Sequence, residues 1–418
     1  MVDARNHARP ALPETMMIKT RMAACVAVCA IASCGAAHAQ SNMTKQQSSS
    51  KPLAEQNYLR FGTSERNVTI APFIQFDIGS ADADPYGAFG TDLDRDTDFR
   101  RARIYASFDY DAFGGLLTVD FANDDAPLTY LFVNYDITDE LTVQLGQQDE
   151  PFSLEDMIGS RSETFAEAGL NAALVPANNV GAALIYGTDH YSLSGGVFFA
   201  DLNHDDLGRN GTGVTGRATF APIATDDEVI HFGLGMTYRD GFDNTTSYGG
   251  GSGSYLVKPT PISTGTFADP GRYFATNFEF AAERGRFSLQ SEFTVAEQDD
   301  GMRGDSTLYG GYVFAAAFLT DDTRPYSAAS GSFGKVDPTS SFFEGGTGAV
   351  QVGARLSFLD LDDAGGSAGR EVAVSGVANW YLSSQIRVTG DVTHTEVTSG
   401  PRDDSSIDAA VLRLSYIY

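Results

Sequence analysis

The sequence predicts an all-β fold: a sixteen-stranded antiparallel transmembrane β-barrel with a long inward-folded loop after its fifth strand. Three observations predict the barrel. Apolar and polar residues alternate with a period of two in segment after segment from residue 67 to residue 418, which is the period of a strand. No stretch in this region approaches the roughly 18 consecutive apolar residues of a membrane-spanning helix. The chain is also rich in glycine and aromatic residues, with 44 Gly, 28 Phe and 18 Tyr, as β-barrels often are.

The N-terminal region is expected to direct export. Residues 1–39 are interpreted as a leader and cleavable signal peptide, because a basic start and a short apolar run end in the small-residue site Ala37-His38-Ala39. Translation is expected to start at Met16 or Met17. The alternatives to a cleavable signal peptide are a buried helix and a lipoprotein signal at 31–34. All three cysteines precede residue 39, so the mature chain is expected to contain no disulfide and no reactive thiol.

The mature chain divides into a short N-terminal segment and one large domain. Residues 40–66 are polar and rich in Ser and Gln, which predicts a flexible segment. Residues 67–418 make up the predicted barrel. Most of its strands have 8–12 residues, close to the roughly 9–11 that cross a bilayer on a tilt. The sixteen strands are expected near 67–77, 99–110, 115–123, 128–136, 140–147, 180–187, 191–200, 213–221, 230–239, 273–283, 286–296, 307–318, 348–359, 371–382, 385–396 and 408–418.

The closing stretch, AAVLRLSYIY at 409–418, shows the alternation clearly. Tyr418, Leu414 and Leu412 share one apolar face, whereas Arg413 lies on the other. Such a stretch is typical of a strand that closes a barrel in a lipid membrane. We therefore expect Tyr418 to be the final residue of the barrel's assembly signal. A soluble β-sandwich also alternates and is the structural alternative.

The lengths of the connections give an independent test of the topology. If both ends of the domain are periplasmic, the connections after even-numbered strands are periplasmic turns, which bacterial barrels keep short. Most of them here have two to four residues, for example 111–114 and 284–285. The connection 319–347 breaks the rule, so it is either a genuine insertion or a slip in the strand count. The outer loops 148–179 and 240–272 each exceed thirty residues.

Residues 148–179 are the best candidate for a loop that folds into the barrel as a constriction. The segment mixes apolar anchors such as Phe152 and Phe165 with charged residues, and a loop packed inside a lumen needs both. An ordinary surface loop of this length would be more polar. The expected constriction residues are Gln147, Gln148, Glu150, Glu155, Asp156 and Arg161.

Composition and motifs argue against several other functions. The net charge of −27 disfavours nucleic acid as a partner. No enzymatic motif, metal site or cofactor site is expected, since an H-E-x-x-H motif and a Walker loop are absent and the four histidines after residue 39 have no ligand spacing. The stretch DLDRDTD at 92–98 resembles the start of a calcium loop but lacks its glycine and final glutamate. The enzymatic alternative to a barrel that performs no covalent chemistry is an outer-membrane hydrolase with its site on the barrel rim.

Several stretches, taken in their order along the chain, resemble one family. They are DFRRARIYASFDYD at 98–111, LGQQDEPFSLEDMIGSRSETFAEAG at 145–169, GRATFAP at 216–222, HFGLGMTYRD at 231–240, NWYLSSQIRVTGDVTHTEV at 379–397 and VLRLSYIY at 411–418. Together they resemble the phosphate-selective porin O/P family over roughly residues 67–418. The resemblance implies a sixteen-stranded barrel of the bacterial outer membrane, a homotrimer, and an anion-conducting pore with lumenal arginines.

Seven arginines fall, by strand parity, on the face opposite the apolar one, which is the lumenal face. They are Arg101, Arg103, Arg217, Arg239, Arg355, Arg387 and Arg413. One interpretation is that arginine avoids lipid, where it costs about 2–4 kcal/mol at the bilayer midplane. The other is an anion path in which guanidinium groups pass phosphate or carboxylate from one to the next. Acids on the same face oppose such a path: Asp77, Asp109, Asp120, Glu279, Glu292 and Asp391.

The sequence departs from the family's pattern in features that bear on phosphate. Phosphate-selective members carry basic residues where this chain has Gln144, Gln147 and Gln148. Lysine is rare after the predicted cleavage site; its positions are Lys45, Lys51, Lys258 and Lys335. We therefore expect passive diffusion of small anions with a modest preference and no dedicated tight phosphate site. A general, non-selective diffusion porin is the alternative.

The expected partners follow from this interpretation. Small inorganic or organic anions would pass through the barrel, and outer-membrane lipid and lipopolysaccharide would surround it. Acidic residues gather in the predicted outer loops, for example at 299–300 and 403–404. Such acids are expected to share divalent cations with the anionic groups of lipopolysaccharide.

Overall fold

The computed structural model describes residues 59–84, 89, 96–122, 126–203, 211–242, 245–257, 260–365 and 368–418. The expected export signal and most of segment 40–66 lie outside these residues. Every described residue belongs to one compact unit of the chain, Ala39–Tyr418.

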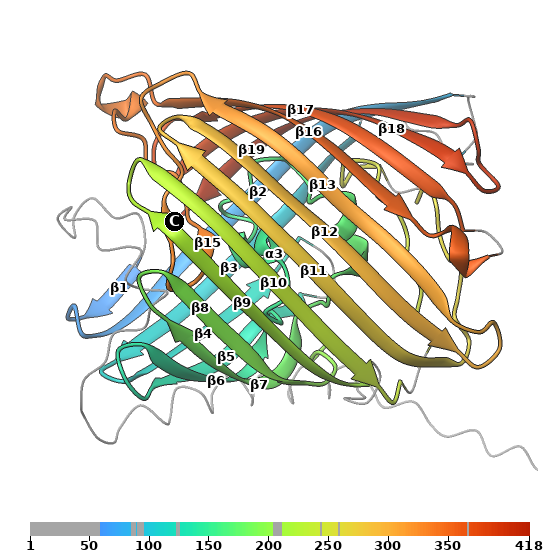
Figure 1. Ribbon diagram of the computed structural model, residues 1–418. Helices are drawn as coiled ribbons and strands as arrows, with labels where there is room; N and C mark the ends of the chain where they lie inside the picture. The colour runs from blue at the N-terminus through green and yellow to red at the C-terminus, as the bar shows by residue number, and fades with distance from the viewer. Residues whose placement is uncertain are drawn as a thin grey trace, which may run out of the picture. The chain divides into compact units, whose positions relative to one another are not determined.

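Sixteen long strands in the described part of the chain form a closed antiparallel barrel (Figure 1). They are β2 (Arg66–Asp84), β3 (Asp96–Tyr110), β4 (Phe113–Asp120), β5 (Leu128–Asp136), β6 (Leu141–Gln148), β7 (Asn179–Gly187), β8 (Tyr191–Phe198), β9 (Thr212–Ala224), β10 (Glu228–Asp240), β11 (Pro270–Arg284), β12 (Phe287–Asp300), β13 (Ser306–Phe318), β16 (Ala349–Asp360), β17 (Arg370–Tyr381), β18 (Ile386–Ser399) and β19 (Ser406–Ile417). Each pairs with the next, and the ring closes where β19 pairs with β2. The predicted sixteen-stranded barrel is confirmed, although β2 runs on to Asp84 rather than ending near residue 77.

The barrel wall separates two environments, as β12 illustrates. Its outward residues are apolar, with Phe287 63% exposed and Phe293 40% exposed, whereas Gln290, Glu292 and Thr294 are buried. A strand that alternates in this way places one face against lipid and the other toward a polar interior. Closure of the ring gives both edges of each spanning strand a partner, as a bilayer requires. The predicted alternation is therefore confirmed in this strand.

A short strand that the sequence pattern did not predict extends the seam of the barrel. β1 (Leu59–Gly62) pairs with the beginning of β2, with Leu59 opposite Ile70. β19 pairs with β2 only as far as Phe73. β1 therefore occupies the edge of β2 that β19 leaves uncovered.

The connections show the predicted asymmetry between the two ends of the barrel, here called the turn end and the loop end. Asp111 and Ala112 alone join β3 to β4 at the turn end. β13 pairs directly with β16, although 319–348 lies between them. This segment contains β14 (Tyr326–Ser327), β15 (Ser332–Phe333) and η3 (Phe342–Glu344). Segment 319–348 is thus a genuine insertion at the turn end, and the strand count does not slip.

Three short helices lie in connections at the loop end. α3 (Leu154–Ile158) and η2 (Leu170–Leu174) lie between β6 and β7, and η4 (Asp362–Ala364) lies between β16 and β17. Within the described residues, no helix is long and apolar enough to cross a membrane.

Candidate functional site

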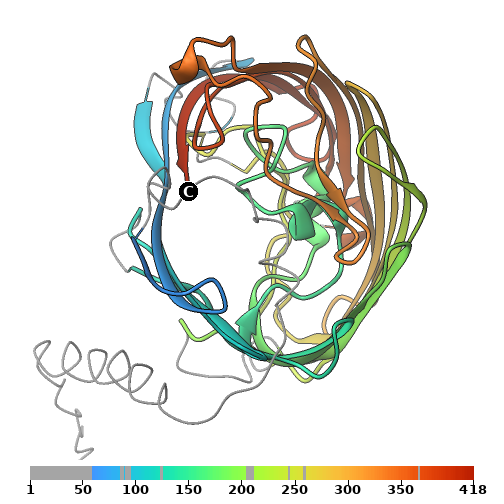
Figure 2. The same cartoon turned by 90° about the vertical axis from the view of Figure 1, so that its left-hand side faces the viewer.

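The long connection between β6 and β7, residues 149–178, lies inside the barrel and is here called the inner loop (Figure 2). The main-chain N–H groups of Leu154 and Glu155 donate to the Glu292 carboxylate on β12, at 2.6 and 3.1 Å. Glu292 alternates with exposed apolar residues and is therefore lumenal. Its carboxylate satisfies N–H groups at the start of α3 that the helix itself leaves without acceptors.

The distal part of the inner loop is bound by β17, β18 and β19. The N–H of Ala166 donates to Asp391 at 3.0 Å, and Asn379 donates to the carbonyl of Thr164 at 2.8 Å. Arg413 donates to the carbonyl of Ala166. Contacts with β12 at one point and with β17–β19 at another place the inner loop across the barrel interior.

Apolar side chains anchor the inner loop. Leu154 and Ile158 of α3 are buried and cluster with Phe333 of β15 and with residues of the wall. Phe165 packs edge-on against Phe314, with 5.4 Å between the ring centres, a favourable geometry for two aromatic rings. Full burial of a side chain of this size stabilises the folded state by about 1.5–3 kcal/mol. The inner loop is therefore packed in place rather than exposed to solvent.

Segment 319–348 enters the interior from the turn end. Arg217 on β9 donates to the carbonyl of Gly331 at 2.7 Å, and the hydroxyl of Tyr326 lies 2.8 Å from Nδ1 of His231 on β10. β15 of the same segment packs against α3 of the inner loop. The two segments therefore meet inside the barrel, although they enter from opposite ends.

A third segment, the described part of 241–269, reaches across the loop end. The N–H of Gly251 donates to Glu371 on β17 at 3.1 Å, and Arg402 donates to the carbonyl of Thr260 at 2.7 Å. The segment starts between β10 and β11, so these contacts lie on strands and connections remote from its origin. Three segments therefore fill part of the interior, of which the sequence analysis expected one.

Five of the seven predicted lumenal arginines are paired with carboxylates. The pairs are Arg103–Asp120 (2.7 Å), Arg217–Glu279 (2.7 Å), Arg413–Asp77 (2.7 Å), Arg355–Glu155 (3.5 Å) and Arg239–Glu150. Three of the carboxylates come from the wall, and Glu150 and Glu155 come from the inner loop. Each pair cancels most of the charge that its arginine would otherwise present to a passing ion.

Arg101 and Arg387 differ from the other five arginines, because no carboxylate pairs with them in the part of the chain that the structure describes. Arg101 donates to the side-chain oxygen of Gln75 at 2.6 Å, and Arg387 donates to the main-chain carbonyl of Glu163 at 2.7 Å. The Nε of each is buried and has no hydrogen-bond partner among the described residues. Two guanidinium charges on the lumenal face are thus held by neutral acceptors.

Arg100 is a lumenal cation that strand parity missed. The register of β2 with β3 shifts between Gln75 and Phe76, so Arg100 is the additional residue of a β-bulge. It donates two hydrogen bonds, both of 2.9 Å, to Glu167 of the inner loop. A bulge interrupts the alternation of a strand, and a period-two pattern alone does not reveal it.

Glu167 binds the inner loop to two strands of the wall. Arg413 on β19 donates to it at 2.7 Å, in addition to Arg100 on β3. Burial alone would raise the pKa of Glu167, but the charges of Arg100 and Arg413 lower that pKa to about 2. Glu167 is therefore ionised at neutral pH and forms a charged link between the loop and both strands.

Gln147 and Gln148, predicted to contribute to the constriction, are engaged at the end of β6. Gln147 donates to the carbonyl of Leu128 at 2.6 Å, and Gln148 accepts a hydrogen bond of 2.8 Å from Gln144. Both are buried, and Gly146, which precedes them, has a φ of 128°. A Cβ atom there would lie 2.1 Å from a main-chain oxygen of β5. These amides therefore serve contacts within the wall and the adjoining connections.

The other four predicted constriction residues belong to the inner loop itself. Glu150 is buried at the start of the loop, in its pair with the wall. Burial raises the pKa of Glu155. Burial, followed by the charge of Asp149, raises the pKa of Asp156 well above its usual range. Arg161, in contrast, lies against aromatic rings.

Arg161 and Tyr418 meet in the interior. The guanidinium carbon of Arg161 lies 5.1 Å from the ring centre of Tyr105 and 5.0 Å from that of Tyr418. Tyr105 is a buried lumenal residue of β3. The prediction that Tyr418 continues the outward apolar face is therefore wrong. β19 ends at Ile417, and the ring of the following residue turns inward.

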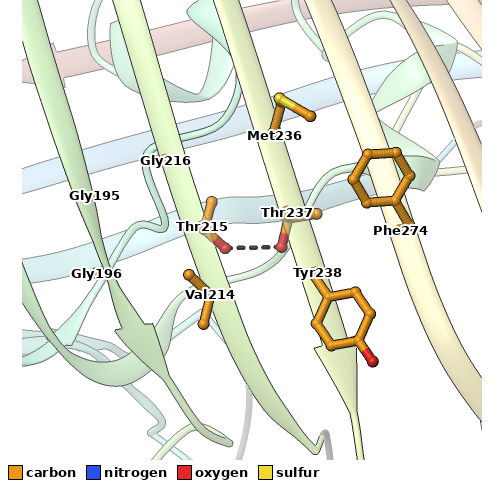
Figure 3. A pocket seen from close by; sticks show the side chains of 9 residues that line it. All are labelled: Gly195, Gly196, Val214, Thr215, Gly216, Met236, Thr237, Tyr238 and Phe274. Carbon is orange, nitrogen blue, oxygen red and sulfur yellow. Dashed lines mark hydrogen bonds between the residues drawn. The ribbon is translucent and has the colours of Figure 1, made fainter.

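An apolar hollow of about 430 Å³ lies on the outer wall over β8 to β11 (Figure 3). Its lining includes the outward side chains of Val214, Met236 and Phe274. Thr215 and Thr237 also line it. Both are buried, and their hydroxyl oxygens lie 2.8 Å apart. The hollow therefore belongs to the lipid-facing surface and not to a path through the lumen.

The acidic stretch at 92–98 is described only in its second half. Asp96 and Asp98 each accept a hydrogen bond from the next main-chain N–H, at 2.7 and 2.8 Å. Asp92 and Asp94 lie outside the described residues. Among the residues that the structure describes, no group of three or more His, Cys, Asp or Glu side chains is placed to hold a metal ion.

Comparison with known proteins adds evidence at the level of sequence. The family described as phosphate-selective porin O and P matches residues 73–418. An uncharacterized protein of Caulobacter vibrioides is 27% identical over 345 residues, which cover 78% of this chain and 68% of that protein. Porin O of Pseudomonas aeruginosa is 26% identical over 337 residues, which cover 71% of this chain and 73% of that porin.

Solved structures add evidence at the level of fold. OmpT of Vibrio cholerae has a TM-score of 0.53 at 12% identity, covering 86% of this chain and 100% of that one. The anion-selective porin from Comamonas acidovorans also has a TM-score of 0.53 at 12% identity, covering 84% of this chain and 100% of that one. At this identity the likeness concerns the fold alone. The closed barrel and the match over 73–418 together lead to one conclusion: the chain belongs to the phosphate-selective porin O and P family and is a porin of the bacterial outer membrane.

Proposed function

We propose that this porin conducts small anions by passive diffusion through a water-filled lumen, with a modest preference for anions over cations and without covalent chemistry. The observation that carries the proposal is that two arginines, Arg101 and Arg387, are buried on the lumenal face without a carboxylate partner among the described residues. Fixed charges of this kind act over about a Debye length, roughly 8 Å at physiological salt. A narrowed lumen keeps a passing ion within that distance.

The preference is modest because lumenal acids oppose it. Asp77, Asp120 and Glu279 are engaged by arginines and contribute little field of their own. Glu292 and Asp391 accept main-chain N–H groups of the inner loop instead. Hydrogen bonds of this kind stabilise a carboxylate but do not cancel its charge, so these two acids reduce the anion preference at any pH at which they are ionised.

Phosphate is expected to pass without a dedicated tight site. Tight phosphate binding uses convergent cationic or N–H donors. Gln147 and Gln148 stand where phosphate-selective relatives are expected to be basic, and their amides are already engaged by neighbouring protein groups. Inorganic phosphate should therefore not block chloride current at micromolar concentration.

A general diffusion porin without ion preference is the second candidate. The observation that favours it is that five of the seven lumenal arginines have carboxylate partners. The reversal potential of the wild-type porin in a potassium chloride gradient separates the two candidates. A potential displaced toward that of chloride supports anion preference, whereas a potential near zero supports the general porin.

We also infer a homotrimer embedded among outer-membrane lipids. One structure of Vibrio cholerae OmpT, with a TM-score of 0.50 and 12% identity, is described as a trimer form. Exposed acids at the loop end, such as Asp403 and Asp404, would share divalent cations with lipopolysaccharide. Cross-linking of the purified porin in detergent tests the trimer, and a predominantly monomeric product would contradict it.

A further inference from the structure

We propose that Tyr418 is a positioning residue that attaches the inner loop and segment 319–348 to the closing seam of the barrel, and so holds the narrowed interior in one conformation. The proposal rests on the proposed function in one respect, since it assumes that these segments narrow a conducting lumen. One contact from each segment reaches the same residue.

The contact from the inner loop is made by Arg161. Its guanidinium lies 5.0 Å from the ring centre of Tyr418 and 5.1 Å from that of Tyr105, and the two ring centres are 5.3 Å apart. One cation and two rings therefore form a single cluster. The attraction between a cation and an aromatic face is stronger when both are removed from water, and the planar guanidinium stacks on rings in a way that the lysine ammonium does not.

The contact from segment 319–348 is made by Lys335. Its Nζ donates to the main-chain oxygen of Tyr418 at 2.6 Å. Lys335 follows β15 closely, and Phe333 of β15 packs against Leu154 and Ile158 of the inner loop. The two segments thus touch each other directly and also share Tyr418 as a common attachment.

Tyr418 is well suited to this role because its support is rigid. The preceding residue, Ile417, pairs with Phe73 across the seam between β19 and β2. Phe73, Tyr105 and Ile417 form a buried cluster against which Tyr418 packs. The seam is the pairing that closes the ring, so the attachment is complete only when the barrel is closed. The position of the inner loop is thereby tied to completion of the barrel.

A purely electrostatic role for Arg161 makes different predictions. Tyr418→Leu removes a ring and no formal charge, and Arg161→Lys keeps the positive charge but loses the planar stacking group. If Tyr418 positions the inner loop, both variants should detach it. If Arg161 acts only as a fixed charge, both should behave like the wild type. Tyr416→Leu is the matched control, since Tyr416 is the same residue type in β19 and, two residues away, lies on its outward face.

The readout is the reactivity of a single cysteine in the folded, purified porin. Ser162→Cys places a thiol in the inner loop, and the chain has no other cysteine after residue 39. Loss of a buried cation–aromatic contact should increase the detached population, and hence the rate of labelling by a maleimide, by roughly tenfold. Tyr418→Leu and Arg161→Lys should show this increase, and Tyr416→Leu should not. Unchanged labelling in both test variants would overturn the proposal.

Single-channel recording separates this proposal from the proposed function. Conductance and current noise should rise in Tyr418→Leu and Arg161→Lys. If the wild type carries no current while labelling still increases in the variants, the proposed function fails and the attachment stands. If Tyr418→Leu does not assemble, Arg161→Lys decides the question, because it leaves the final strand intact.

Discussion

Pairing, rather than number, determines which lumenal arginines act as fixed charges. Arg217 donates two hydrogen bonds of 2.7 Å to Glu279 and is almost fully buried. Such a pair presents a dipole rather than a net charge to the lumen. Its main effect is therefore on stability, because removal of one partner leaves the other charge buried and uncompensated.

We predict that Arg217→Gln destabilises the barrel by about 3–5 kcal/mol. The temperature at which the folded, faster-migrating gel band is lost measures this effect. Arg101→Gln is the matched control, since Arg101 has no paired carboxylate in the described chain, and it should lower that temperature less. Adding Glu279→Gln to Arg217→Gln should restore most of the loss. Equal destabilisation by the two arginine variants would contradict the prediction.

We predict that Lys335 makes the proposed ion preference depend on pH. Burial, followed by the charge of Arg161, lowers the pKa of Lys335 from 10.5 to about 8. Its positive charge is therefore present below pH 8 and lost above it, so anion preference should fall as the pH rises from about 7 to 9. The unfolded chain keeps this proton up to its ordinary pKa of 10.5, so the destabilising effect of burying the Lys335 charge diminishes as the pH rises from about 8 to 10.5.

Reversal potentials recorded across this pH range in the wild type and in Lys335→Met test the assignment. The variant should lack the part of the pH dependence that Lys335 causes. Identical profiles in the two proteins would assign the pH dependence to other groups.

Residue-level prediction from the sequence succeeded where alternation holds and failed where it is interrupted. Parity placed Arg413 on the lumenal face correctly. It missed Arg100, because a β-bulge adds a residue to β3, and it misplaced Tyr418, because β19 ends one residue earlier. The partner of Arg413, Asp77, lies across the seam of the barrel, and no local pattern relates residues so far apart in sequence.

At the scale of elements, the inner loop is the part most directly expected to limit conductance. Deleting residues 155–165 removes most of α3 and the Arg161 contact, and should raise the single-channel conductance because it clears space in the lumen. The deletion leaves every spanning strand intact. Single-channel recording of the correctly folded porin measures the effect, and an unchanged conductance would mean that this segment does not limit the current.

Sequence patterns predicted the inner loop better than segment 319–348. The inner loop carries apolar anchors, and Phe152 and Leu154 are fully buried, as a loop packed against other groups requires. Segment 319–348 was recognisable only as unusually long. Its inward path depends on contacts such as Arg217 with Gly331, which the length of a connection does not specify.

At the scale of the whole molecule, the strand count was predictable because one physical constraint acts on every spanning segment. Lipid on one side and a polar interior on the other impose a period of two over some ten residues. The sequence analysis did not predict β1, because its four residues are too few to show a period of two. The narrowed interior was predicted only in part, since three segments from different connections build it and their contacts are tertiary.

The most direct test asks whether unpaired arginines set the ion preference. It compares the reversal potential of the wild type with that of the Arg101→Gln/Arg387→Gln double variant in the same potassium chloride gradient. The wild type should prefer anions modestly, and the double variant should lose most of that preference while remaining folded. Arg272→Gln, which changes an exposed arginine at the outer end of β11, should behave like the wild type. A cation-selective wild type, or a double variant with an unchanged reversal potential, would contradict the role assigned to Arg101 and Arg387.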